Sequence, residues 1–335
     1  MLHMSPVCVA VVSVLLIAAV TCKTDYCELC SLKKTHTMCK YPKPGPGKGC
    51  APYSVHNYPM TFEEKKKLVD IHNELRNTVA QGSATEGDPG PQPSAKNMRL
   101  MVSSPTGACR KIIFIIIISW DEELEIIATR WADQCQHFKT DKPHDECRDS
   151  ERFAVGQNIA AVSQRDASPQ DPVELAESWF IGEVSNFNNE WVHKYLGQVK
   201  PGEKISHYTQ LVWGDSYLVG CGRVVFEEKD NVLVTRLVCN YGPGGNIIGM
   251  PLYKVGDPCS ECPDNTTCKH PLYTGLCASK CLVQHEVSAL DHAATEAGFR
   301  QISCNVIASV VYWSEFPGTD PEIPDSIPGS SRIFL

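Results

Sequence analysis

A pair of apolar runs near the middle of the chain constrains its fold more than any other feature. The runs Val219–Phe226 and Val232–Tyr241 are rich in Val, Leu, Phe and Tyr, and the polar link Glu227–Asn231 separates them. This pattern predicts a β-hairpin with a longer loop. Folding the chain about the middle of the link places Cys221 opposite Cys239, so a cross-strand disulfide is geometrically easy. A polar group held next to such a stapled hairpin has a rigid platform behind it.

The number of cysteines indicates the redox compartment in which the protein is found. The 335 residues include 17 cysteines at scattered spacings, too many for a reducing cytosol, which predicts a disulfide-bonded secreted protein. Zinc is the competing interpretation of the pairs Cys27/Cys30 and Cys259/Cys262, but neither has the matching second pair and histidines of a zinc finger. The net charge of −8 argues against a nucleic-acid partner and against a general affinity for anionic membranes.

The first 22 residues are predicted to be a signal peptide. Val7–Val20 is a run of small and apolar residues, too short to span a bilayer comfortably, and Ala-Val-Thr (19–21) is a small-x-small cleavage site. Cleavage of the signal peptide after Cys22 or after Lys23 is an alternative. We therefore expect a secreted, extracellular protein without a membrane span, followed from 23 to 60 by an arm that cysteines must order, because it has no apolar periodicity.

Three helices are predicted from caps and apolar periodicity. The first begins at Thr61 with a Thr-x-x-Glu capping box and runs to Gly82; the second follows Asp121, and the third follows Asp171-Pro172. Their apolar stripes are Leu68, Ile71, Leu75 and Val79; Leu124, Ile127, Ala128, Trp131 and Cys135; and Ala176, Trp179, Phe180 and Glu183. His72 lies beside the first stripe and is predicted to be structural rather than a ligand. Helices before and among short strands, without regular βαβ alternation, indicate an α+β layered domain.

Two long motifs resemble the paired signatures of the CAP superfamily, which includes cysteine-rich secretory proteins, antigen 5 venom allergens and pathogenesis-related proteins. They read His-Tyr-Thr-Gln-Leu-Val-Trp (207–213) and Leu-Val-Cys-Asn-Tyr-Gly-Pro-Gly-Gly-Asn (237–246). The segments at 25–30, 87–98 and 155–158 resemble the antigen 5 branch. The likeness runs from Tyr26 to Ala278 and implies a three-layer α-β-α sandwich at 61–253, with a disulfide-stapled N-terminal arm and a short Cys-rich C-terminal hinge.

The resemblance also implies a disulfide pattern that the spacings alone leave open. The implied pairs of the arm are Cys27 with Cys39, Cys30 with Cys147, and Cys50 with Cys135. Residues 254–281 resemble the hinge of secreted CAP proteins and contain four further cysteines, which are Cys259, Cys262, Cys268 and Cys277. Asn265-Thr-Thr within this unit is a glycosylation sequon on an expected exposed loop.

Two parts of the chain depart from the family. Twenty-one residues separate Met98 from Trp120, where family members have only a few, and the excess at 102–118 carries Cys109 and an uncharged Ile-rich run. A buried extra strand is one interpretation; an unspliced intron is the one we favour, because such a run aggregates when exposed. The tail at 282–335 matches no known pattern, and Cys281 and Cys304 are assigned no partner.

The family's central cleft carries two histidines and two acids, and its histidines can hold a divalent metal. The motifs map these positions onto His144, Gln157, Glu183 and His207, with His144 and His207 as the metal-binding pair. Because Gln157 replaces an acid and cannot take up a proton, we expect only weak Zn²⁺ binding, with no other cofactor, and reduced hydrolytic capacity. A polar cluster that only orders the cleft is an equally open interpretation.

These features favour a non-enzymatic, monomeric extracellular binding protein. By resemblance, its partner is a lipid or other small hydrophobic ligand or a host protein, in a venom, salivary or immune-related role. The alternative is a metal-dependent or serine-type peptidase. Ser206 adjoins His207, but adjacent side chains usually diverge and no Gly-x-Ser-x-Gly elbow is present.

Overall fold

The computed structural model describes residues 24–56, 58–101, 120–136, 143–197, 200–280, 283 and 332–334. The predicted signal peptide, the insertion at 102–118, the three cysteines without an assigned partner and most of the tail lie outside these residues. The described part combines helices with an antiparallel sheet, so the α+β class is confirmed. None of its helices is long and apolar enough to cross a membrane.

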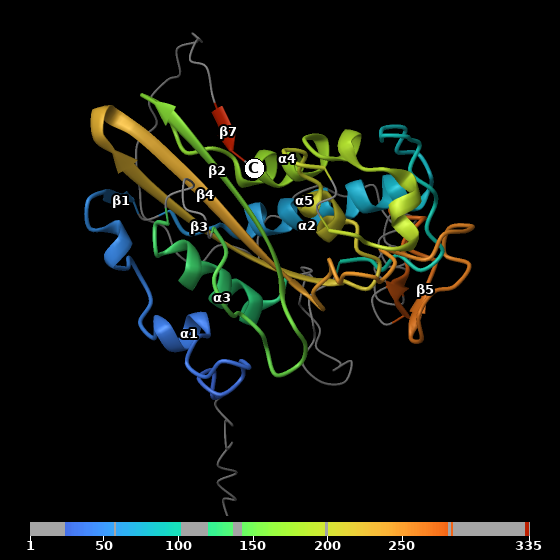
Figure 1. Ribbon diagram of the computed structural model, residues 1–335, viewed down its shortest axis with the longest axis horizontal. Coiled ribbons are helices and arrows are strands. Elements are labelled where there is room, and N and C mark those ends of the chain that lie inside the picture. The colour runs from blue at the N-terminus through green and yellow to red at the C-terminus, as the bar shows by residue number, and fades with distance from the viewer. Residues whose placement is uncertain are drawn as a thin grey trace, which may run out of the picture.

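A five-stranded antiparallel sheet forms the middle layer, in the order β1-β3-β4-β2-β7 (Figure 1). The strands of this sheet are β1 (Ser54–His56), β2 (Gly156–Arg165), β3 (Leu218–Glu228), β4 (Val232–Gly242) and β7 (Arg332–Phe334). A separate pair, β5 (Thr266–Thr267) and β6 (Ala278–Ser279), lies in the hinge-like unit.

Helices cover both faces of the sheet. Helix α3 packs against β3 and β4 on one face, while α2, α4 and α5 lie on the other (Figure 1). The helices are α1 (Thr37–Lys40), α2 (Phe62–Ala80), α3 (Glu122–Ala132), α4 (Pro172–Ile181) and α5 (Ser206–Leu211); the 3₁₀ turns are η1 (Lys48–Cys50), η2 (Val184–Asn186), η3 (Asn189–His193) and η4 (Lys229–Asn231). The expected three-layer α-β-α sandwich is therefore confirmed.

The alternation of side chains along each strand divides the hydrophobic core between the two faces of the sheet. Val224 and Phe226 of β3 pack in one apolar cluster with Trp131 of α3. Cys221 and Val219 of the same strand belong to the larger cluster under α2 and α4. Successive side chains of a strand point to opposite faces, so one hairpin supplies both interiors.

The predicted hairpin is present in the predicted register. Cys221 pairs with Cys239 across β3 and β4, and the two are joined by a disulfide. The η4 turn closes the hairpin, with Asp230 at φ 64° and Asn231 at φ 56°. Asp and Asn are the non-glycine residues that most readily adopt this left-handed conformation, which explains why the polar link suits the loop.

The three predicted helix starts are correct. Thr61 caps α2 in a reciprocal capping box with Glu64, while Asp121 and Asp171 cap α3 and α4. Two predicted helix memberships are wrong. Cys135 lies beyond the end of α3 with φ 47°, where it meets Cys50 of the arm, and Glu183 lies beyond the end of α4.

Disulfides attach the arm to the sandwich in the pairing that the resemblance implies. Cys27 joins Cys39, Cys30 joins Cys147, and Cys50 joins Cys135. Residues up to Cys50 are thereby fixed against α3 and the segment that leads into β2.

The hinge-like unit is closed by two further bonds, Cys259–Cys268 and Cys262–Cys277. Its Asn265 is exposed, as a glycosylation acceptor must be. Glycosylation itself stays a prediction.

A buried arginine fixes the position of α5. Arg76 of α2 is fully buried, and its guanidinium donates hydrogen bonds to the backbone carbonyls of Leu211, Trp213, Ser216 and Arg99. Desolvation lowers the pKa of Arg76 to about 9. The guanidinium of Arg76 thus supplies donors for the backbone carbonyls at and just beyond the C-terminal end of α5, and these bonds hold the short helix in place.

Candidate functional site

His207 sits in the first turn of α5, where Glu183 holds both its backbone and its ring. Glu183 is fully buried, and its Oε2 atom accepts from the backbone N–H groups of His207 (2.8 Å) and Tyr208 (3.0 Å). Its Oε1 atom lies 2.6 Å from Nδ1 of His207. Because a carboxylate can only accept, Nδ1 of His207 carries a proton, so in the neutral tautomer of this ring the lone pair is on Nε2.

A chain of amides orients His144 in the same way. The carbonyl of Leu124 in α3 accepts from Nδ2 of Asn240 (3.3 Å), which turns Oδ1 of Asn240 toward Nε2 of Gln157 (2.9 Å). Oε1 of Gln157 then faces Nδ1 of His144 at 2.8 Å. Since that oxygen can only accept, His144 also carries its proton on Nδ1 and presents Nε2 unprotonated.

Electrostatics keep His144 neutral. Burial of the ring lowers the pKa of His144; the hydrogen bond that His144 donates to Gln157 raises it, and positive charge on Arg148 and His207 lowers it. The residue as a whole is exposed, so water at its outer edge screens part of this effect. The depressed pKa favours the neutral ring at neutral pH, and the hydrogen bond to Gln157 places the proton of that neutral ring on Nδ1.

The four predicted positions therefore form two hydrogen-bonded pairs, His207 with Glu183 and His144 with Gln157. Asn158, the residue after Gln157 in β2, donates from Nδ2 to the backbone carbonyl of His207 at 2.9 Å. This bond links the two pairs. Glu183 and Gln157 both use their polar atoms to orient histidines, so neither stands free as an acid or as a ligand.

Two contributors to this site are absent from the sequence-based set. Asn240 lies inside the 237–246 motif, but its role depends on facing Gln157 across β2 and β4, a register that the motif does not state. Trp179 is predicted only as part of an apolar stripe. Its ring lies parallel to that of His207, with centroids 6.3 Å apart.

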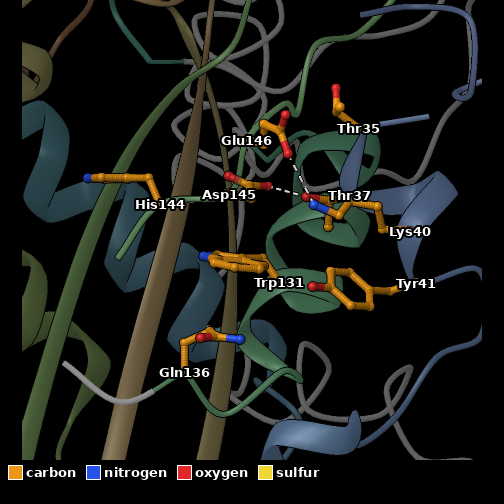
Figure 2. Close-up of a pocket in the computed structure, with 9 residues that line it drawn as sticks. All are labelled: Thr35, Thr37, Lys40, Tyr41, Trp131, Gln136, His144, Asp145 and Glu146. Carbon is orange, nitrogen blue, oxygen red and sulfur yellow. Dashed lines mark hydrogen bonds and ion pairs between the residues drawn. The ribbon is translucent and has the colours of Figure 1, made fainter. Parts of the chain in front are cut away.

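A separate cavity of about 220 Å³ lies between the arm and α3. Figure 2 shows the ring of His144 pointing away from the other residues that line this cavity. Lys40 pairs with Glu146 and Thr37 bonds to Asp145 across it. Within the described residues, none of the other three predicted positions lines the cavity, so it is not the histidine site.

The cysteine clusters do not form zinc sites. Cys259, Cys262 and Cys277 lie close enough to share a metal ion, but Cys262 and Cys277 are bonded to each other and Cys259 to Cys268. Cys27 and Cys30 are likewise in disulfides. A disulfide sulfur is not a thiolate ligand, so the disulfide interpretation of both C-x-x-C pairs is confirmed.

Known proteins share the arrangement of this chain. The family described as "CAP: Cysteine-rich secretory protein family" matches residues 69–241. Venom allergen 3 of Solenopsis invicta is 42% identical over 70% of this chain and 91% of its own length. Venom allergen 5 of Polistes dominula is 38% identical over 73% of this chain and 96% of its own length.

Solved structures with detectable similarity include that of Na-ASP-1, with 26% identity, 70% of this chain and 51% of that chain covered, and a TM-score of 0.49. The crystal structure of NaASP2 with Zn²⁺ gives 28% identity, 67% of this chain and 100% of that chain covered, and a TM-score of 0.46.

Proposed function

Because this chain belongs to the cysteine-rich secretory protein (CAP) family and is similar to venom allergens 3 and 5, we propose that it is a secreted extracellular binding protein and not an enzyme. The observation that carries the proposal is that Glu183 and Gln157, which stand at the family's acid positions, are both fully engaged in hydrogen bonds. Glu183 accepts three N–H groups with its two oxygens, and Gln157 is bonded at both ends of its amide. Hydrolysis needs a side chain that is free to exchange a proton with a substrate.

One feature favours the peptidase alternative. The pair of His207 and Glu183, with Nε2 of the histidine unprotonated, resembles the base and orienting acid of a catalytic triad. A triad also needs a nucleophile that hydrogen-bonds to the base. Within the described residues, no Ser, Thr or Cys side chain bonds to either histidine ring, and Ser206 contacts Asn246 and Thr209 through its backbone carbonyl. The binding function is therefore the better supported of the two.

The site has the donors that suit Zn²⁺. Two imidazoles whose Nδ1 atoms are already bonded can offer a metal ion only Nε2, and nitrogen is a preferred zinc ligand. We propose that His144 and His207 hold the ion through Nε2, with Glu183 and Gln157 orienting the rings. A bound Zn²⁺ would supply a Lewis acid for an oxygen atom of a partner. Affinity should be weak, because zinc sites usually have three or four protein ligands.

The partner that we propose is a lipid or other small hydrophobic ligand, or a host protein. This partner class is the one that the family resemblance implies, and the protein is proposed to act as a monomer. Extraction of the purified protein with organic solvent, followed by mass spectrometry, tests for a carried ligand. A peptide-library cleavage assay on the same sample tests the alternative.

We expect no cleavage above that of a His144→Ala/His207→Ala variant of the same protein. Peptide hydrolysis that is efficient in the wild type and absent from this variant would overturn the binding function. His193→Ala, which removes an exposed histidine on η3, is the matched control.

A further inference from the structure

Four exposed aliphatic side chains gather on two neighbouring loops. Leu196, Ile247, Ile248 and Met250, here called the aliphatic patch, are between 47% and 68% exposed. They are four of the ten exposed large hydrophobic residues of the described chain. Single exposed aliphatic residues are normal on a protein surface, but a contiguous group indicates a contact site.

The two loops are fixed to each other and to α5. The backbone N–H of Tyr195 donates to the carbonyl of Met250 (2.7 Å), and that of Gly249 donates to the carbonyl of Tyr195 (2.8 Å). Asn246 adds a bond from its side chain to the carbonyl of Ser206 at 2.7 Å. These bonds hold the backbone of the two loops together, so the exposed side chains stand on an ordered surface.

The turn at Gly249 faces open space. Gly249 has φ +85°, and a side chain placed there would meet no atom within 4 Å. At this position no neighbouring atom forms the wall of a groove. Such a turn suits a soft surface into which the side chains of Ile247 and Ile248 can insert.

Free positive charge flanks the patch. Lys194 precedes it in one loop and Lys204 lies just before Ser206, to which Asn246 is bonded. Both lysines are exposed and, among the described residues, neither has an ion-pair partner, whereas Lys200 between them is paired with Asp88 and Glu203. Aliphatic side chains beside lysines match a phospholipid surface, whose acyl boundary is apolar and whose headgroups carry negative charge.

From this combination we propose that the aliphatic patch docks the protein reversibly on an anionic lipid surface. A protein partner fits less well, because interface hot spots are enriched in Trp, Tyr and Arg, none of which belongs to the patch. The net charge of −8 keeps the rest of the surface away from such a membrane, so contact is confined to this face. Docking through the aliphatic patch does not depend on the histidine site.

The test is sedimentation of the metal-free protein with vesicles of phosphatidylcholine, with and without phosphatidylserine. Ile247→Ser/Ile248→Ser should weaken binding at least about tenfold, because two apolar side chains no longer leave water. Lys194→Glu/Lys204→Glu should abolish the preference for phosphatidylserine. Leu272→Ser is the matched control, since Leu272 is equally apolar and 74% exposed but lies in the hinge-like unit.

Every variant retains the Ile-rich run at 112–118, so any effect of this run on sedimentation is common to all of them. The test therefore compares vesicle binding between variants. Equal binding by Ile247→Ser/Ile248→Ser and Leu272→Ser would overturn the proposal, as would a wild type that does not bind. A mass in analytical ultracentrifugation that rises with concentration for the wild type, but not for Ile247→Ser/Ile248→Ser, would identify the patch as a contact between copies and also overturn it. Zinc titration of the same variants shows separately whether the histidine site is intact.

Discussion

Oε1 of Glu183 lies 2.6 Å from Nδ1 of His207, and the other oxygen of this fully buried carboxylate accepts the two backbone N–H groups that open α5. A single side chain thus sets the position of the helix and the tautomer of the imidazole. This arrangement makes Glu183 a structural and orienting group, although its motif position alone would allow it to be an acid or a ligand.

Replacing Glu183 with Gln should therefore reduce both stability and metal affinity. The amide has one acceptor oxygen where the carboxylate has two, so at least one N–H group is left buried without a partner. We expect a loss of about 2–3 kcal/mol in the free energy of unfolding, measured by urea denaturation. Glu122→Gln, at an exposed position of α3, is the control and should change little. An unchanged free energy for Glu183→Gln would contradict the role given to its second oxygen.

Asn240 is predicted to act on the metal site without touching the metal. Asn240→Leu removes the partner that keeps the amide of Gln157 in one orientation, so His144 should populate both tautomers. ¹⁵N NMR of the imidazole reports the tautomer directly, and zinc affinity should fall about tenfold. Thr235→Val, another buried polar substitution on β4, controls for general damage to the strand. A single Nδ1-protonated form of His144 in the Asn240 variant would refute the relay.

Acid should destabilise the fold through His72. This residue is buried, with Nδ1 donating to the carbonyl of Leu68 and Nε2 next to the hydroxyl of Tyr241, and burial lowers its pKa from 6.5 to about 4. The unfolded state therefore binds more protons than the folded state between these values. Its contribution is fully present above about pH 6.5 and is lost as the pH falls toward 4, by up to about 3 kcal/mol.

Urea unfolding at pH 7 and pH 4.5 measures this effect. His72→Gln cannot titrate, so it should lose less stability between the two pH values than the wild type does, even though it is less stable at pH 7. His193→Gln, at an exposed position, should behave as the wild type. The same pH dependence in all three proteins would show that His72 is not responsible.

Local signals in the sequence were enough to predict the hairpin and the starts of three helices. The caps Thr61, Asp121 and Asp171 and the facing pair Cys221 and Cys239 each act over a few residues or across one turn. Such features can be found without knowing how distant segments pack.

The rest of the site depends on contacts between distant segments. β2 lies between β4 and β7 and is buried on both faces over most of its length, so its sequence lacks the polar alternation that marks an exposed strand. Glu183 continues the helical spacing of Trp179 but leaves the helix, because its carboxylate binds the start of α5. The link from Leu124 through Asn240 to Gln157 joins residues 116 and 83 positions apart, and its second bond forms only when β2 lies beside β4.

The most direct test of the account is a calorimetric titration of Zn²⁺ into the wild type and into His144→Ala/His207→Ala at neutral pH, with His193→Ala as control. We predict weak binding to the wild type and to the control, loss of the heat in the double variant, and weakening of wild-type binding on acidification because a protonated imidazole cannot be a ligand. Equal heats from the wild type and the double variant would contradict a metal site at these two histidines.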